Sequence, residues 1–130
     1  MGQQQLLLII LGVIIVGIAI AVGLSLFSAN SIQSNKDAII NDINNLAANA
    51  YQYRIRPASM GGGQNSYAGY KVPSKMSNNE NAIYNAGTPT AVEVTFTATS
   101  AQNAANTVVT KIDSLGKFVS GSWTYTGDFQ

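Results

Sequence analysis

The sequence contains neither cysteine nor histidine, and only 10% of its 130 residues are charged. Without cysteine the chain can form no disulfide framework and no thiolate metal site. Without histidine it lacks the commonest metal ligand and the usual general base. The six acidic residues are scattered along the chain and form no pair suited to acid–base catalysis. These absences argue against an enzyme and predict no catalytic residue, no metal site and no cofactor.

Neither sign of charge predominates in the sequence. Seven basic and six acidic side chains give a formal net charge of +1. A nucleic-acid-binding surface needs clustered lysine and arginine, so no nucleic acid partner is expected. The triple glycine Gly61–Gly63 is not followed by the Lys-Ser/Thr pair of a phosphate-binding loop. Most polar side chains are Asn, Gln, Ser and Thr, which give a neutral, hydrogen-bonding surface suited to packing against copies of the chain.

The most prominent segment that is present is an apolar run from Leu6 to Phe27, with no charge and one polar side chain, Ser25. As a helix it is roughly 33 Å long, about the thickness of the hydrocarbon core of a bilayer. Residues 1–5 carry no basic side chain and the run is long, which disfavours a cleaved secretory signal peptide. Leucine at position 6 disfavours N-myristoylation. The run predicts a helix that spans a membrane or is buried among other helices.

Beyond Phe27 the apolar residues recur at spacings of three and four, with Asn, Asp and Lys between them. No proline occurs before Pro57, which is expected to end the helix. The pattern predicts one helix of roughly 50 residues, ~75 Å long. Two helices broken near residues 28–31 are the less favoured alternative. The apolar stripe consists of Ile32, Ile39, Ile40, Ile43, Leu46, Ala47, Ala50 and Tyr51.

The remainder of the chain predicts loops followed by strands. Residues 59–66, rich in Gly, Ser and Asn, are predicted to be a flexible connecting segment, and residues 75–81 are a second polar stretch. Residues 92–99 and 119–126 alternate between apolar and polar side chains, which predicts two half-buried strands. Phe96 and Trp123 are expected in the core of the sheet.

Residues 101–115 fit two interpretations. Their apolar side chains follow a helical stripe that would end at Gly116, but residues 107–112 are a β-branched run. The strand is favoured over the helix. A turn at residues 114–117 would then join it to the next strand.

The predicted fold class is therefore α+β. One long N-terminal helix, apolar in its first half and amphipathic in its second, packs against a small antiparallel sheet of three to four strands. The expected organisation is an apolar helix over residues 1–27, its amphipathic continuation over 28–56 and a β-rich globular head over 57–130. The side chains expected to pack the helix against the head are Ile39, Ile43, Leu46, Ala50 and Tyr51.

In this arrangement the chain resembles a type IV pilin. The resemblance rests on the apolar run Leu6–Phe27 near the N-terminus, on the unbroken helix to about Arg56, and on the β-rich remainder. It covers the whole chain in architecture, but only about residues 1–50 in sequence character. Pilins are single-span inner-membrane proteins until the pilus assembly machinery extracts them, and their apolar half-helices then bundle into the core of a helical filament.

The resemblance implies a structural subunit that polymerises with many copies of itself into an extracellular cell-surface filament and has a membrane-inserted precursor. The residues implied at the filament core and subunit interface are Gln5, Leu6, Leu7, Leu8, Ile9, Ile10, Leu11, Gly12, Val13, Ile14, Ile15, Val16, Gly17, Ile18, Ala21, Leu24 and Phe27.

The chain departs from the pilin pattern in two respects. Pilins usually carry Glu at the fifth mature position, where it neutralises the terminal amine of a neighbour, and this chain has Gln5. A glutamine still accepts a hydrogen bond from an amine, and its burial costs less than that of a carboxylate. A prepilin also has a short basic leader that ends in Gly. Either that leader precedes Met1, or Met1 and Gly2 are all of it.

Several interpretations stay open. Gly17 with Ala21, and Ala19 with Gly23, form small-residue pairs that allow close helix contact, or mark places where the helix loosens. Arg54 and Arg56 either contact an acidic group of a neighbouring subunit, such as Asp128 or Glu93, or form a solvated helix end.

Two other classes of protein remain as alternatives. The first is a single-span, membrane-anchored small β-domain that acts as an envelope or binding protein. The second is a filamentous coat protein, which the size of the β-rich part disfavours.

Overall fold

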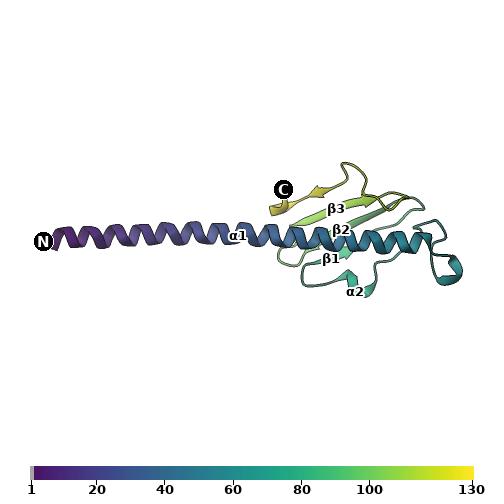
Figure 1. The fold of residues 1–130 in the computed structure, drawn as a ribbon, viewed down its shortest axis with the longest axis horizontal. Helices are drawn as coiled ribbons and strands as arrows, with labels where there is room; N and C mark the ends of the chain where they lie inside the picture. Colours follow the sequence, from purple (N-terminus) through teal and green to yellow (C-terminus); the bar gives the residue numbers. More distant parts are fainter. Residues whose placement is uncertain (1) are drawn as a thin grey trace. The chain divides into compact units, whose positions relative to one another are not determined.

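The computed structural model describes residues 2–130 and shows one long helix followed by a small sheet (Figure 1). This confirms the predicted α+β class. The elements, in chain order, are α1 (Gly2–Ile55), the 3-10 turn η1 (Ala58–Met60), α2 (Ser74–Ser77), β1 (Ala82–Asn85), β2 (Val94–Ser100), β3 (Thr107–Ile112), β4 (Thr124–Tyr125) and the 3-10 turn η2 (Gly127–Phe129).

Helix α1 is continuous over 54 residues, so the alternative of two helices broken near residues 28–31 is wrong. Ser and Asn in that stretch are weaker helix formers than Ala, but they do not remove a backbone donor as proline does. By packing, the chain divides into two compact units, one that ends at Gln33 and one that comprises Ser34–Gln130. The second is called the head unit below.

The four strands form one antiparallel sheet in the order β1-β2-β3-β4. Phe96 pairs with Thr110 and Ala98 with Val108, which places alternate side chains of β2 and β3 on the same face. On that face the side chains of Val94, Phe96 and Ala98 are fully buried. The strand interpretation of residues 107–112 is thus confirmed.

The core of the head unit lies between this face and the buried stripe of α1, Ile39, Ile43, Leu46 and Ala50. Three aromatic side chains outside the sheet complete the core, Tyr67, Tyr70 and Phe129. Burial of such side chains is the main favourable term in folding, so the second half of α1 is held mainly by the sheet that covers it.

The C-terminal strand is shorter than predicted. Only Thr124–Tyr125 forms a strand (β4) beside β3, and Phe118 makes an isolated β-bridge with Ile112. Between them Gly121 adopts a φ of +75° and the Ser122 amide donates to the Val119 carbonyl, which closes a turn. Trp123 is half-buried and lies outside the core, contrary to expectation; the buried aromatic at this end of the chain is Phe129. The expected turn after β3 is present, with the Gly116 amide bonded to the Asp113 carbonyl.

The polar segment 59–66, predicted to be flexible, is held to the end of α1 by backbone hydrogen bonds, and the second polar stretch contains regular structure. Residues 75–81 contain part of α2 and a β-bridge from Asn78 to β1. Strand β1 itself was not predicted, because its four residues are too few for an alternating pattern to stand out.

The glycine-rich loop packs over the end of α1. The Gly63 amide donates to the Tyr53 carbonyl (2.7 Å), and the Asn65 amide donates to the Arg54 carbonyl (2.6 Å). A Cβ at Gly63 would lie 1.8 Å from the Ser66 carbonyl oxygen, so only glycine fits there. The loop therefore caps carbonyl groups that the helix end leaves without intrahelical partners.

Candidate functional site

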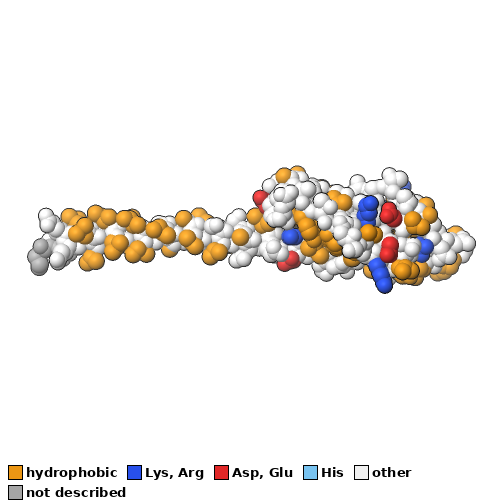
Figure 2. Space-filling model, turned by 90° about the horizontal axis from the view of Figure 1, so that it is seen from above, with side chains coloured by type: hydrophobic (Ala, Val, Ile, Leu, Met, Phe, Trp, Pro, Cys, Tyr) orange, Lys and Arg blue, Asp and Glu red, His pale blue; other side chains and the backbone are white. Residues whose placement is uncertain are grey.

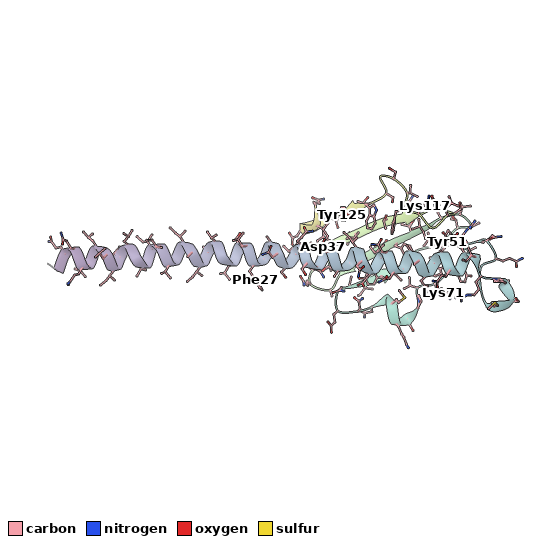
Figure 3. All side chains as sticks on the ribbon, viewed as in Figure 1. Phe27, Asp37, Tyr51, Lys71, Lys117 and Tyr125 are labelled. Carbon is pink, nitrogen blue, oxygen red and sulfur yellow. The ribbon has the colours of Figure 1, made fainter. Side chains whose placement is uncertain are left out.

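The first candidate site is the apolar segment of α1. Its large side chains from Leu6 to Phe27 are all exposed, from 52% at Leu11 to 73% at Phe27. Figure 2 shows this part of the helix covered with apolar side chains and free of blue or red, and in Figure 3 its side chains project on all sides. Continuous apolar surface of this extent marks a membrane or protein interaction site. α1 is accordingly long and apolar enough to span a membrane.

The residues predicted for the filament core lie on this segment, apart from Gln5 directly before it, and all remain accessible. Gln5, Ala21 and Leu24 are exposed like the large side chains around them. A Cβ added at Gly12, Gly17 or Gly23 would meet no atom within 4 Å, so the surface at each glycine is open. An open glycine allows another backbone to approach closely.

The residues predicted to pack the helix against the head fall into two groups. Ile39, Ile43, Leu46 and Ala50 are buried, with exposed fractions of 1% or less. Tyr51 is only half-buried; its ring lies against the turn at Gly116, where a Cβ would come within 2.8 Å of it.

A buried polar side chain at the start of this stripe, Asn35, was not predicted from the sequence. Asn35 is buried, accepts a hydrogen bond from the Ser100 hydroxyl (2.6 Å) and donates one to the Asn81 carbonyl (3.2 Å). Its position four residues before Ile39 is the signal that could have found it, because the two side chains share a helix face.

The second candidate site is a hydrogen-bonded cluster around Asp42. One oxygen of its carboxylate accepts hydrogen bonds from the side-chain amide of Asn79 (3.0 Å), the side-chain amide of Asn81 (3.0 Å) and the Tyr84 hydroxyl. Burial raises the pKa of Asp42, but these three hydrogen bonds lower it by more, so the pKa lies below its ordinary value of 3.8. The cluster ties α1 to β1 and to the segment before it.

The tyrosines around this cluster stay protonated near neutral pH. Burial raises the pKa of Tyr84, and the hydrogen bond to Asp42 and the charge of that carboxylate raise it further. Burial also raises the pKa of Tyr70, to about 12. Both hydroxyls therefore act as hydrogen-bond donors, Tyr84 to Asp42 and Tyr70 to the side-chain oxygen of Asn49 (2.8 Å). The two hydrogen bonds join residues of α1 to β1 and to the segment before α2.

Acid is expected to loosen this cluster. Because the pKa of Asp42 is lower in the folded chain, its contribution to stability is fully present above about pH 4 and is lost as the pH falls through the folded-state pKa. We expect Asp42→Asn to lower the melting temperature at pH 7 and to flatten the decline of the melting temperature as the pH falls below about 4. Glu80→Gln, which removes an exposed charge outside these bonds, is the matched control for the melting curves. An equal flattening in the control would contradict the role of Asp42.

The third candidate site is a hollow of about 320 Å³ at the C-terminal end of α1. Its polar side chains come from the helix, from Arg56 just after the helix and from the loop before α2, and no carboxylate lines it. Neither Arg56 nor Lys71 has a carboxylate partner among residues 2–130, and both are exposed. Arg54 points elsewhere, with its guanidinium 5.6 Å from the centre of the Tyr67 ring. The lining residues are Asn49, Tyr53, Arg56, Gly69, Tyr70, Lys71 and Pro73.

No protein-family model, curated protein or solved structure matches this chain. The function is therefore argued from the residues themselves. Within residues 2–130 no group of three or more His, Cys, Asp or Glu side chains is placed to hold a metal ion. The feature of the described chain that differs most from an ordinary soluble domain is the exposed apolar segment.

Proposed function

We propose that this protein is a structural subunit that polymerises into a helical cell-surface filament, in the manner of a type IV pilin, with the apolar segment of α1 in the filament core. The observation that carries the proposal is the uninterrupted exposure of that segment, from Leu6 to Phe27. In water these side chains are stable only when other apolar groups cover them. Copies of the same segment would cover them in a filament, and lipid would cover them in a membrane-inserted precursor.

A lone membrane anchor fits the segment less well. Membrane spans are normally held at the two interfaces by Lys, Arg, Trp or Tyr. Here the first charged side chain is Lys36 and the first Tyr or Trp is Tyr51, both well beyond Phe27. Three open glycines along the segment favour close contact between helices, which a single anchor does not need.

The remaining features agree with a structural role. The polar clusters of the head unit, such as the one around Asp42, join α1 to the sheet and leave no arrangement of nucleophile and base. No catalytic group, metal or cofactor belongs to the proposal. Its partners are other copies of the chain, a membrane before assembly, and the machinery that assembles such filaments.

Electron microscopy tests this proposal directly. The full chain purified in detergent is expected to form long fibres of uniform width when the detergent is removed, because the apolar segments then have only one another to cover them. The fibres should contain this chain alone on a gel. If the chain instead inserts into added lipid vesicles as a monomer and gives no fibres under any condition, the membrane-anchored β-domain becomes the better interpretation.

A further inference from the structure

The hollow at the C-terminal end of α1 is lined by side chains rich in hydrogen-bond donors. The Arg56 side chain carries five N–H donors, Lys71 three and the Asn49 side-chain amide two. The hydroxyls of Tyr53 and Tyr70 are already committed as donors, to the Ala68 carbonyl (3.1 Å) and to Asn49. With two cations and no lining carboxylate, the hollow has an excess of donors and a positive charge.

An exposed carboxylate stands at the other end of the head unit. Asp128 lies in the turn η2, and its backbone amide donates to the side-chain oxygen of Asn106 (2.8 Å). Gly127 in this turn has a φ of +66°, and a Cβ at this position would lie 2.2 Å from the side-chain oxygen of Asn106. Only glycine therefore fits there. The Asp128 side chain itself has no hydrogen-bond or ion-pair partner among residues 2–130, so it is free to pair with another molecule.

The hollow and the Asp128 turn lie at opposite ends of the head unit. The turn is at the level of Asn35, because Asn106 bonds to Ser100, and Ser100 bonds to Asn35. Arg56 comes 21 residues later on the chain, just beyond the end of α1, which corresponds to about 30 Å along the helix axis. Figure 3 shows the same separation, with Asp37 and Tyr125 at one end and Lys71 at the other.

We propose that Asp128 of one subunit binds between Arg56 and Lys71 of the next. This inference rests on the proposed filament and names the contact between its head units. The two partner surfaces differ, so the contact is heterologous, and repetition of a heterologous contact that does not close into a ring gives an open helical polymer. The same contact fixes the direction of each added subunit, because only one order of the two surfaces brings opposite charges together.

Charge reversal with compensation tests this contact. The full chain is purified in detergent, the detergent is removed, and the concentration of subunit left unpelleted is measured at 0.05 M and 0.5 M NaCl. The Arg56→Glu/Lys71→Glu variant and the Asp128→Lys variant are each expected to raise that concentration about tenfold at low salt, which corresponds to ~1.4 kcal/mol. The combined triple variant is expected to recover to within about threefold of the wild-type value. High salt should reduce the differences, since it screens exposed charges.

The matched control is Lys111→Glu/Lys117→Glu, which makes the same change in net charge at two exposed lysines outside the hollow. It should leave assembly unchanged. The contact would be overturned if the control raised the unpelleted concentration as much as the charge reversals do, or if the triple variant did not return toward the wild-type value. The contact would also be overturned if Arg56→Glu/Lys71→Glu raised the unpelleted concentration and Asp128→Lys did not. That result would mean that the hollow binds a free anion instead of Asp128. If the wild-type chain never pellets, the proposed filament fails and the contact fails with it; if it pellets and the reversals have no effect, only the contact fails.

Discussion

Gly17→Leu is expected to abolish filament formation while the head unit stays folded. Apart from the neighbouring residues and the backbone of the helix itself, no atom lies within 4 Å of a Cβ at this position, so the isolated subunit accommodates leucine. In a bundle, the larger side chain would prevent the close helix approach that glycine allows. The substitution also makes the segment more apolar, so a lone membrane anchor would tolerate it.

Leu11→Asp should have the same outcome for a different reason. Its carboxylate would be buried among apolar side chains, at a cost of about 2.5–3.5 kcal/mol on membrane-insertion scales. Asn41→Asp, on an exposed position of the same helix but outside the apolar segment, adds the same charge and should assemble normally. Pelleting and electron microscopy measure assembly, and thermal melting followed by near-ultraviolet circular dichroism measures the fold. Normal fibres from both Gly17→Leu and Leu11→Asp would rule out a core made of this segment.

The second large effect concerns the core of the head unit. Phe96→Ala is expected to lower the free energy of unfolding by about 3–5 kcal/mol, because Phe96 is fully buried and its removal leaves a cavity between α1 and the sheet. A small domain has about 5–15 kcal/mol in total, so the variant should be close to unfolding at 37 °C. Urea denaturation of the full chain in detergent measures the change.

Thr97→Ala is the control for this variant, since Thr97 is the next residue on β2 and points to the outer face of the sheet. Its effect should be within about 0.5 kcal/mol. A loss below about 1 kcal/mol for Phe96→Ala would show that the sheet does not form the core described above.

The helix and its packing stripe could be predicted from the sequence because their signals extend over many residues. The absence of charge up to Lys36 and the three-four spacing of Ile39, Ile43 and Leu46 are both long-range patterns. Strands β2 and β3 were predicted for the same reason, from alternation and a β-branched run.

What the sequence did not predict depends on single residues or on contacts between distant segments. Val92 belongs to the alternating run but is 55% exposed and outside β2, because the pairing with β3 begins at Val94. The turn at Gly121 removes Trp123 from the core, although the alternation continues through both residues. The hollow is lined by residues of α1 and by Lys71 from a later loop. No local sequence pattern predicts that these two segments lie side by side. The assembly function stays a proposal, both from the sequence and from the structure.

The glycine loop after α1 has an electrostatic consequence. The peptide dipoles of a helix sum to a partial negative charge at its C-terminus, which would repel an incoming carboxylate. In this chain the amides of Gly63, Gln64 and Asn65 donate to the carbonyls of Tyr53, Arg56 and Arg54, respectively. The positive ends of these N–H groups offset the negative end of the helix dipole beside the hollow. Arg56 and Lys71 are then the main charges beside the hollow. This surface therefore attracts anions, although the C-terminal end of a helix ordinarily attracts cations.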